Sequence, residues 1–239
     1  MRLKNAFKYQ MASMLKAIGI YYGAILAIRI GLSLISIFII GDEKIHMSAF
    51  ESNTLVFMLF LGIFSIVEDF KFFVQNGYSR KSLMKLYLLQ FLACSAILAG
   101  LDVISAIVFA SFDVYESLCF QIYGTQNILM QFLWLVVVYT CVGMVSFFMT
   151  ILVQRMNKVQ RIVYLLLLPL ALIMFLPLLD VYVWNHALSS FAWDVLLRIM
   201  GFYDGVSMMV STFSFTIITI IFCLLSYLTI RRASVFMQS

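Results

Sequence analysis

Long apolar runs alternate with short polar or mixed segments along the 239 residues of this chain. A helix needs about 20 apolar residues to cross the roughly 30 Å hydrocarbon core of a bilayer. Six runs are close to that length, so the pattern predicts one all-α membrane domain with six transmembrane helices. The runs cover residues 17–40, 54–74, 86–109, 128–153, 162–179 and 206–230.

The second run is the least regular of these, because two acidic residues interrupt it. Its unbroken apolar part covers only residues 55–67, which is too short to span a bilayer alone. Glu68 and Asp69 follow, and phenylalanines then resume the apolar pattern. We expect the acidic pair to lie at the level of the cytoplasmic lipid headgroups, with the aromatic rings in the interface.

The composition excludes most other classes of protein. Hydrophobic residues make up 64% of the chain and charged residues 11%, whereas globular proteins average about 45–50% and about 25%. An ordinary soluble enzyme, a disordered chain and a disulfide-stabilised secreted domain are therefore excluded. The four cysteines form no CxxC pair and there are only two histidines, so we expect small core thiols rather than a metal site.

Charge is distributed unevenly over the predicted loops, although the net charge is only +5. One set of loops carries thirteen basic residues, whereas the other set has only Lys44 and Arg198, together with eight acidic residues. Because basic loops stay in the cytoplasm, both termini are predicted to be cytoplasmic. The thirteen residues are Arg2, Lys4, Lys8, Lys16, Lys71, Arg80, Lys81, Lys85, Arg155, Lys158, Arg161, Arg231 and Arg232.

Residues 1–16 precede the first run and are both basic and amphipathic. Leu3, Phe7, Met11 and Met14 recur at helical spacing, while the lysines fall mostly on other faces. The pattern predicts an interfacial helix that lies along the cytoplasmic membrane surface before the chain turns into the first span. Such a helix is either an ordinary basic anchor or a structural element that also contacts a partner protein.

Residues 75–85, between the second and third runs, form the most informative loop. Asn76-Gly77 is a turn signal, and Ser79 is a candidate N-cap for a short basic helix over residues 80–85. A solvated turn gives this pattern, and so does a segment that docks into a cleft on a soluble partner. The candidate contact residues are Gln75, Asn76, Gly77, Tyr78, Ser79, Arg80, Lys81 and Lys85, with Glu68 and Asp69 close to them.

Residues 181–203, between the fifth and sixth runs, are too apolar for a free loop. Apolar residues at four-residue intervals favour a helix, and Trp184 and Trp193 suit the lipid interface. We expect one or two short helices that dip into the outer interface as a re-entrant hairpin, either anchoring the chain or covering a pathway. Before this segment, Pro169 and Pro177 are expected to bend the fifth span.

Only Arg29 and Asp102 place a charge deep within a predicted span. An intramembrane charge costs at least about 2.5 kcal/mol on insertion scales, so each is expected to face protein or water. Counted at about 1.5 Å per residue, their depths differ by about 6 Å, which an arginine side chain can bridge. A direct ion pair, an aqueous cavity and a contact with another subunit are all consistent with this pattern.

Sequence signatures of catalysis and phosphate binding are absent. The chain contains no GxxxxGK[ST], HExxH, GxSxG or GxGxxG pattern. It therefore cannot hold ATP phosphates in a phosphate-binding loop of that kind. We predict no metal site and no bound cofactor for this chain.

The layout resembles that of the type-2 ABC exporter permeases, the membrane subunits of bacterial ABC transporters. Those permeases combine a cytoplasmic amphipathic helix, six spans with both ends inside, and short apolar re-entrant helices between spans 5 and 6. Their coupling helix lies between spans 2 and 3, where an acidic residue precedes a Ser/Thr-Arg pair and then a lysine. Here Glu68, the segment Asn76-Gly77-Tyr78-Ser79-Arg80-Lys81 and Lys85 occupy these places.

The resemblance implies a transporter subunit, not an enzyme, in a bacterial cell membrane. The chain would pair with an identical or related permease and with two cytoplasmic ATPase subunits, which would bind ATP and Mg²⁺ and push on residues 75–85. The substrate would be a peptide, a lipid-like molecule or another amphipathic compound, in export or in immunity against antimicrobial peptides. The alternatives are a six-span substrate-capture subunit of a vitamin-type importer, and an intramembrane enzyme or its regulator. No nucleic-acid partner is expected.

Overall fold

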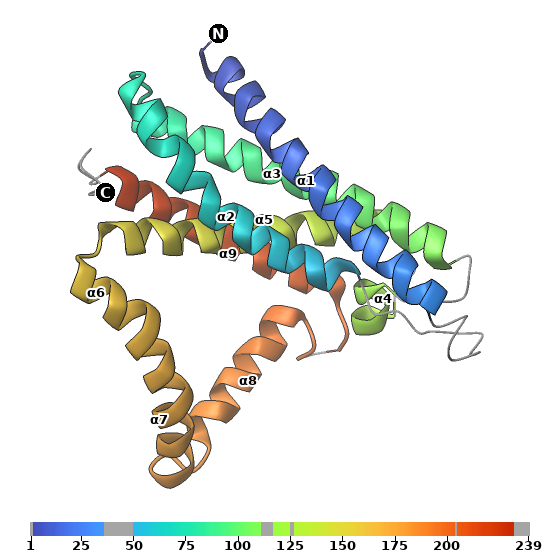
Figure 1. Ribbon diagram of the computed structural model, residues 1–239. Helices are drawn as coiled ribbons and strands as arrows, with labels where there is room; N and C mark the ends of the chain where they lie inside the picture. Colours follow the sequence, from blue (N-terminus) through green and yellow to red (C-terminus); the bar gives the residue numbers. More distant parts are fainter. Residues whose placement is uncertain (1, 36–49, 111–116, 125–126, 204, 232–239) are drawn as a thin grey trace.

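The computed structural model describes residues 2–35, 50–110, 117–124, 127–203 and 205–231 (Figure 1). Within these ranges all regular structure is helical, which confirms the predicted all-α class. The helices are α1 (Arg2–Ile35), α2 (Phe50–Gln75), α3 (Arg80–Ala110), α4 (Leu118–Tyr123), α5 (Ile128–Arg155), α6 (Lys158–Ile162), α7 (Leu168–Tyr182), α8 (Ala187–Met200) and α9 (Met208–Arg231), with a π-helical turn at Val163–Leu167 between α6 and α7.

Four of these helices are long and apolar enough to cross a membrane. They cover Leu3–Ile28 in α1, Arg80–Phe109 in α3, Ile128–Arg155 in α5 and Met208–Arg231 in α9. The segments Lys158–Leu170 and Phe175–Tyr182 pass the same test together, but they are bent by 44°. By length and composition, the described chain is therefore compatible with a multi-pass membrane protein.

Helix α5 lies at the centre of a bundle that also contains α1, α2, α3 and α9 (Figure 1). It packs against α2, α3 and α9, and it buries side chains on nearly all of its faces. Trp134, Tyr139 and Phe147 are among them, each at most 2% exposed. A helix that is apolar all round belongs in the core of a bundle, which is why the run at 128–153 takes this place.

The first apolar run and the segment before it form one continuous helix. Helix α1 passes from the basic residues 2–16 into the first run without a break. The separate interfacial helix and the turn that we predicted there are absent, because no proline or paired glycine interrupts the pattern near Lys16. Likewise, α2 continues through Glu68 and Asp69, whose side chains lie outside the described residues.

Helices α6, α7 and α8 form a V that projects from the bundle (Figure 1). The π-helical turn directly precedes Pro169, and Pro177 lies inside α7, so the predicted bend of the fifth run is present. The tip of the V is closed by Asp180, whose carboxylate accepts hydrogen bonds from the backbone N–H groups of Leu188 (2.8 Å) and Ser189 (3.0 Å). The acidic side chain of α7 thus caps the first turn of α8.

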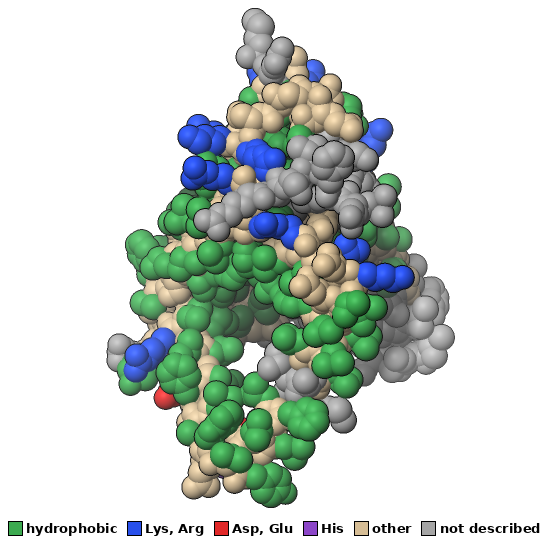
Figure 2. Space-filling model, turned by 90° about the vertical axis from the view of Figure 1, so that its left-hand side faces the viewer, with side chains coloured by type: hydrophobic (Ala, Val, Ile, Leu, Met, Phe, Trp, Pro, Cys, Tyr) green, Lys and Arg blue, Asp and Glu red, His purple; other side chains and the backbone are tan. Residues whose placement is uncertain are grey.

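One end of the molecule collects most of the described basic residues. The start of α1, the turn between α2 and α3, the corner between α5 and α6, and the end of α9 all lie at this end (Figure 1). Figure 2 shows Lys and Arg side chains gathered there, above a surface that is mostly hydrophobic. We call it the basic end. The segments grouped by charge in the sequence are therefore also grouped in space.

Candidate functional site

Contacts among its own residues hold the turn between α2 and α3 in one conformation. Gly77 has a positive φ of 77°, which glycine adopts without strain. Its N–H donates to the carbonyl of Val74 (3.1 Å), and the N–H of Tyr78 donates to the carbonyl of Phe73 (3.1 Å). These are the two hydrogen bonds of a Schellman motif. The aromatic rings of Phe73 and Tyr78 meet edge to face at 5.3 Å, which adds the apolar contact of that motif.

Ser79 caps the helix that follows, as predicted, but that helix is not short. The N–H of Ser82 donates to the Ser79 hydroxyl at 3.2 Å. The predicted separate helix over residues 80–85 is instead the first part of α3, which runs to Ala110. Leu83 and Leu86 explain this difference, because both are fully buried and so anchor the first turns in the same core as the rest of α3. The connecting loop is only residues 76–79.

The basic residues after the turn have different environments. The guanidinium of Arg80 is turned inward, and its Nη1 donates to the backbone carbonyl of Ile230 at 2.6 Å and, at 3.4 Å, to that of Arg231. Lys81 and Lys85 are exposed. The arginine thus caps the C-terminal end of α9, where carbonyl groups carry partial negative charge. Nothing in the local sequence distinguishes Arg80 from its basic neighbours.

A pocket of about 450 Å³ lies beside this turn at the basic end. The N-terminal half of α1 forms one wall, and the end of α2 with the turn forms the other. Tyr9 and Phe72 face each other across it with stacked rings 6.1 Å apart, and Lys4 and Lys8 are exposed on α1. The structure therefore brings together the two segments that the sequence marked separately as possible partner contacts. The pocket is lined by Asn5, Ala6, Tyr9, Phe72, Phe73, Asn76 and Tyr78.

Asp102 is the centre of a second polar site, enclosed in the bundle. Its side chain is fully buried on α3. Tyr22 of α1 donates to Oδ1 at 2.5 Å, Tyr139 of α5 donates to Oδ2 at 2.5 Å, and Thr54 of α2 donates to Oδ1 at 3.2 Å. One carboxylate thereby joins four helices through hydroxyl groups. Hydrogen bonds to a charged acceptor are about twice as strong as neutral ones.

The partners of Asp102 differ from the sequence-based expectation. We considered an ion pair with Arg29, but the Arg29 side chain lies outside the described residues, so the pair stays a prediction. The partners that the structure does describe are Tyr22, Thr54 and Tyr139, none of which was predicted from the sequence. The sequence did contain a signal for the two tyrosines, because a buried tyrosine hydroxyl in an apolar run needs a hydrogen-bond partner.

Further polar contacts join helices in the half of the bundle opposite the basic end. Glu51, fully buried at the start of α2, accepts a hydrogen bond from Gln131 Nε2 at 3.5 Å, and Trp134 Nε1 donates to the hydroxyl of Ser211 on α9 at 3.0 Å. The four cysteines are free thiols. Burial, with a smaller effect from Glu51, raises the pKa of Cys119 on α4 to about 11, so this thiol stays protonated near neutral pH.

In the part of the chain that the structure describes, no group of three or more His, Cys, Asp or Glu side chains is arranged to hold a metal ion. The enclosed acidic groups are held by hydroxyl and amide donors instead. Their arrangement suits the fixing of helices relative to one another rather than contact with a soluble molecule.

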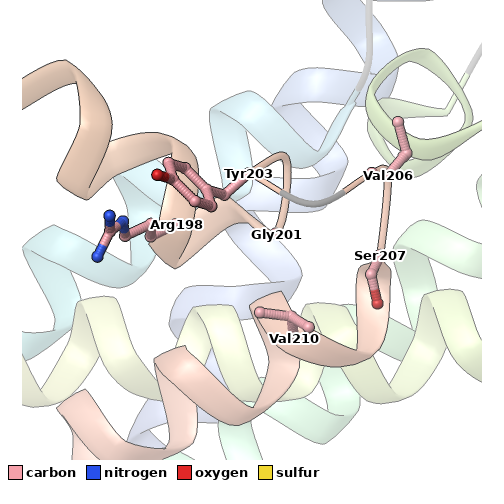
Figure 3. A pocket seen from close by; sticks show the side chains of 7 residues that line it. Arg198, Gly201, Tyr203, Val206, Ser207 and Val210 are labelled. Atoms are coloured by element: carbon pink, nitrogen blue, oxygen red, sulfur yellow. The ribbon is translucent and has the colours of Figure 1, made fainter.

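A second pocket, of about 480 Å³, lies where α8 leads into α9 (Figure 3). Arg198 lies over the ring of Tyr203, with its Cζ atom 4.3 Å from the ring centroid. Gly201 has a φ of 77°, and a Cβ atom there would lie 2.2 Å from the carbonyl oxygen of Ser207, so only glycine fits. The N–H of Ser207 closes the loop onto the Gly201 carbonyl at 2.9 Å. The lining residues are Arg198, Gly201, Tyr203, Gly205, Val206, Ser207 and Val210.

No protein-family model matches this chain, and no curated protein or solved structure is significantly similar to it. Three features of the described residues bear on function. They are the basic end with its rigid turn and pocket, the enclosed carboxylate that joins four helices, and the pocket between α8 and α9.

Proposed function

We propose that this chain is the membrane permease subunit of an ATP-binding-cassette transporter in a bacterial cell membrane. It would move a peptide, a lipid-like molecule or another amphipathic substrate, in export or in immunity against antimicrobial peptides. A separate ATPase subunit would hydrolyse the ATP. In this proposal the chain crosses the membrane six times, with α2 and the bent α6–α7 segment as the second and fifth spans, and the positive-inside rule puts the basic end in the cytoplasm.

The observation that carries the proposal is the pocket at the basic end. A soluble ATPase needs a surface that is exposed, rigid and connected to the membrane helices. The Schellman turn and the stacked Tyr9 and Phe72 rings supply rigidity, and the direct continuation of the turn into α3 supplies the connection. Exposed lysines at the basic end, among them Lys8, Lys81 and Lys85, would favour a partner surface with acidic side chains.

The V of α6, α7 and α8 supports the pairing with a second permease. Its apolar side chains are largely exposed, including Phe175, Trp193 and Leu196 at 62%, 61% and 49%. A surface of this kind is stable only against lipid or another protein. We place the V at the outer side of the membrane, where α8 would be the re-entrant helix and an identical or related permease would cover part of the surface.

A substrate-capture subunit of an importer is the second candidate. The pocket between α8 and α9 favours it, because about 480 Å³ is within the usual range for small ligands and Arg198 supplies a charge at its edge. A capture subunit would retain one small molecule when purified alone, whereas a permease would not. Mass spectrometry of ligand extracted from the purified chain discriminates between these two functions.

The ATPase docking surface is tested by charge reversal of Lys81 and Lys85 together. Both side chains are exposed, whereas Arg80 binds the end of α9, so its reversal would also disturb that end. We expect K81E/K85E to insert normally but to lose the ATPase subunit during affinity purification. The matched control is K158E/R161E, an equal charge change on exposed residues of α6 at the same end. Equal ATPase recovery from the two variants would reject the proposed docking surface.

A further inference from the structure

The inner end of α9 is held by two arginines that come from other helices. Arg80, the first residue of α3, donates to the carbonyls of Ile230 and Arg231, and Nη1 of Arg155, the last residue of α5, donates to the carbonyl of Thr229 at 3.3 Å. The last carbonyls of a helix have no partner within the helix and carry partial negative charge. A guanidinium on each side satisfies them with charge-assisted hydrogen bonds.

The two arginines connect α9 to different parts of the molecule. Arg155 belongs to the central helix of the bundle, whereas Arg80 directly follows the α2–α3 turn. The Arg80 contact bridges 150 positions in the sequence and has the shorter distance, 2.6 Å against 3.3 Å. Ile230, whose carbonyl it binds, is only 1% exposed, so the contact is partly shielded from water.

The turn itself can transmit a displacement because it has little freedom to absorb one. Its Schellman hydrogen bonds, the Phe73–Tyr78 ring contact and the Ser79 cap fix the chain on both sides of Gly77. Arg80 comes immediately after these contacts. A displacement of the turn therefore shifts the guanidinium, and with it the carbonyl groups that the guanidinium holds.

The outer end of α9 is also held, by contacts of a different kind. Trp134 Nε1 donates to the hydroxyl of Ser211, and the Cys119 thiol lies 3.7 Å from the Met208 sulfur. The 24 residues of α9 correspond to about 36 Å of helix, with these contacts near one end and the arginines at the other. The same outer end of α9 also contributes Val210 to the pocket that Arg198 of α8 lines. Helix α9 thus links the basic end to that pocket as one rigid element.

We infer that Arg80 is a positioning residue through which a displacement of the α2–α3 turn is passed to α9 and so to the outer pocket. This inference rests on the proposed function, because it assumes that an ATPase subunit displaces the turn. Arg80 then acts on α9 rather than on the ATPase, while the neighbouring Lys81 and Lys85 face the partner. Basic residues that are close in the sequence thus have different partners: Arg80 binds α9, and Lys81 and Lys85 bind the ATPase subunit.

The test uses the full chain assembled with its ATPase in lipid nanodiscs. Hydrogen exchange is measured by mass spectrometry without nucleotide and after trapping with ATP and vanadate. In the wild type we expect trapping to change exchange rates both at the turn and in the last two turns of α9. A hydrogen bond from an arginine to a carbonyl has the strength usual for charged donors. Its loss or gain should therefore change the exchange rate at α9 by at least about tenfold.

Arg80→Met keeps the apolar stem of the side chain but removes its donors. We expect it to retain the ATPase and the response at the turn, while the difference between the two states at α9 falls below about twofold. A merely structural role would raise exchange at α9 equally in both states and leave their difference unchanged. Arg80→Lys should restore part of the response, because an ammonium donates to one carbonyl. Arg161→Met, an exposed arginine at the same end, is the matched control and should behave as the wild type.

The possible failures are distinguishable. If no ATPase assembles with the wild-type chain, the proposed function is rejected. If the ATPase assembles but α9 does not respond in the wild type, or responds fully in Arg80→Met, the role of Arg80 is rejected and the proposed function stands. If Arg80→Met does not fold by circular dichroism and size-exclusion chromatography, Arg80→Gln replaces it in the same comparison, with the same outcomes.

Discussion

Asp102 shows at the scale of single residues how a charge is accommodated inside an apolar bundle. The carboxylate accepts hydroxyl donors from three other helices, and each donor is itself buried. Removing the acceptor takes one hydrogen bond from each hydroxyl; the Tyr22 hydroxyl also reaches the carbonyl of Leu98 at 3.2 Å and that of Thr54 the hydroxyl of Tyr21 at 3.4 Å. A buried hydroxyl that loses its acceptor costs about 1–3 kcal/mol. The residue is therefore expected to contribute more to stability than its small size suggests.

Asp102→Ala should lower the free energy of unfolding by about 1–3 kcal/mol, chiefly because the Tyr139 hydroxyl loses its acceptor, whereas Tyr22 and Thr54 have further partners. Asp102→Asn should cost less, because the amide keeps one acceptor oxygen. Thermal unfolding in detergent, followed by circular dichroism, measures both. Ile104→Ala on the same helix, where the side chain is 59% exposed, is the control. Equal effects at positions 102 and 104 would contradict a stabilising role for the cluster.

Arg80 marks the limit of what the sequence reveals about single residues. Its charge, its place after a turn and the cap at Ser79 could all be predicted from nearby residues. Its partner could not, because the carbonyl of Ile230 lies 150 positions away and a backbone carbonyl has no sequence signal. The same limit explains why Tyr22, Thr54 and Tyr139 were not connected with Asp102.

At the scale of elements, apolar runs predict where helices lie better than where they begin and end. The runs at 86–109, 128–153 and 206–230 correspond closely to α3, α5 and α9. The small helix α4 was not predicted, although Ser117 caps its start and Gly124, with a φ of 64°, ends it. Six residues are too few for a periodic hydrophobic pattern, so only the capping residues Ser117 and Gly124 indicated this helix in the sequence.

Gly77→Ala tests the turn between α2 and α3. A side chain there must adopt the left-handed conformation, so we expect a loss of stability of about 1 kcal/mol. Gly19→Ala is the matched control, because Gly19 lies within α1 and an added Cβ would meet no atom within 4 Å beyond its chain neighbours and the nearby backbone of its own helix. That change should stabilise α1 by up to about 1 kcal/mol. Chemical denaturation curves compare the two variants, and a neutral or stabilising Gly77→Ala would show that the turn is not held as described.

Asp180→Ala tests the connection between α7 and α8. Without the carboxylate, the N–H groups of Leu188 and Ser189 lose their acceptors, and the first turn of α8 should open more often. We expect faster hydrogen exchange at these two amides, with the rest of the chain unchanged. Asp194→Ala, an exposed aspartate on α8 itself, is the control and should leave these amides protected. Unchanged exchange at both amides in Asp180→Ala would refute the capping role.

At the scale of the whole molecule, the clearest feature is the grouping of basic residues at one end. Segments that are far apart in the sequence bring their basic residues to one end, while the V of α6, α7 and α8 projects elsewhere with an apolar surface (Figures 1 and 2). This grouping could be predicted from the loops, because the positive-inside rule needs only their order and charge. The V could not, because its separation from the bundle depends on packing between distant helices.

The orientation in the membrane is tested by cysteine accessibility. Lys8→Cys at the basic end should react with a membrane-impermeant thiol reagent only from the cytoplasmic side, because basic segments stay inside. Ser190→Cys on α8 should react only from the outer side. Both positions are exposed, and the native thiols are buried or half-buried and give the background. Labelling of both positions from the same side would exclude the proposed six-span arrangement.

The most direct test of the central claim is purification of the full-length chain from its native membrane together with whatever is bound to it. If the chain is a permease subunit, an ATPase with a phosphate-binding loop should co-purify in a fixed ratio, and the complex should hydrolyse ATP with vanadate sensitivity. The K81E/K85E variant should lose both the subunit and the activity. A chain that purifies without an ATPase, and that instead retains a small molecule or shows an enzymatic activity of its own, would contradict the account.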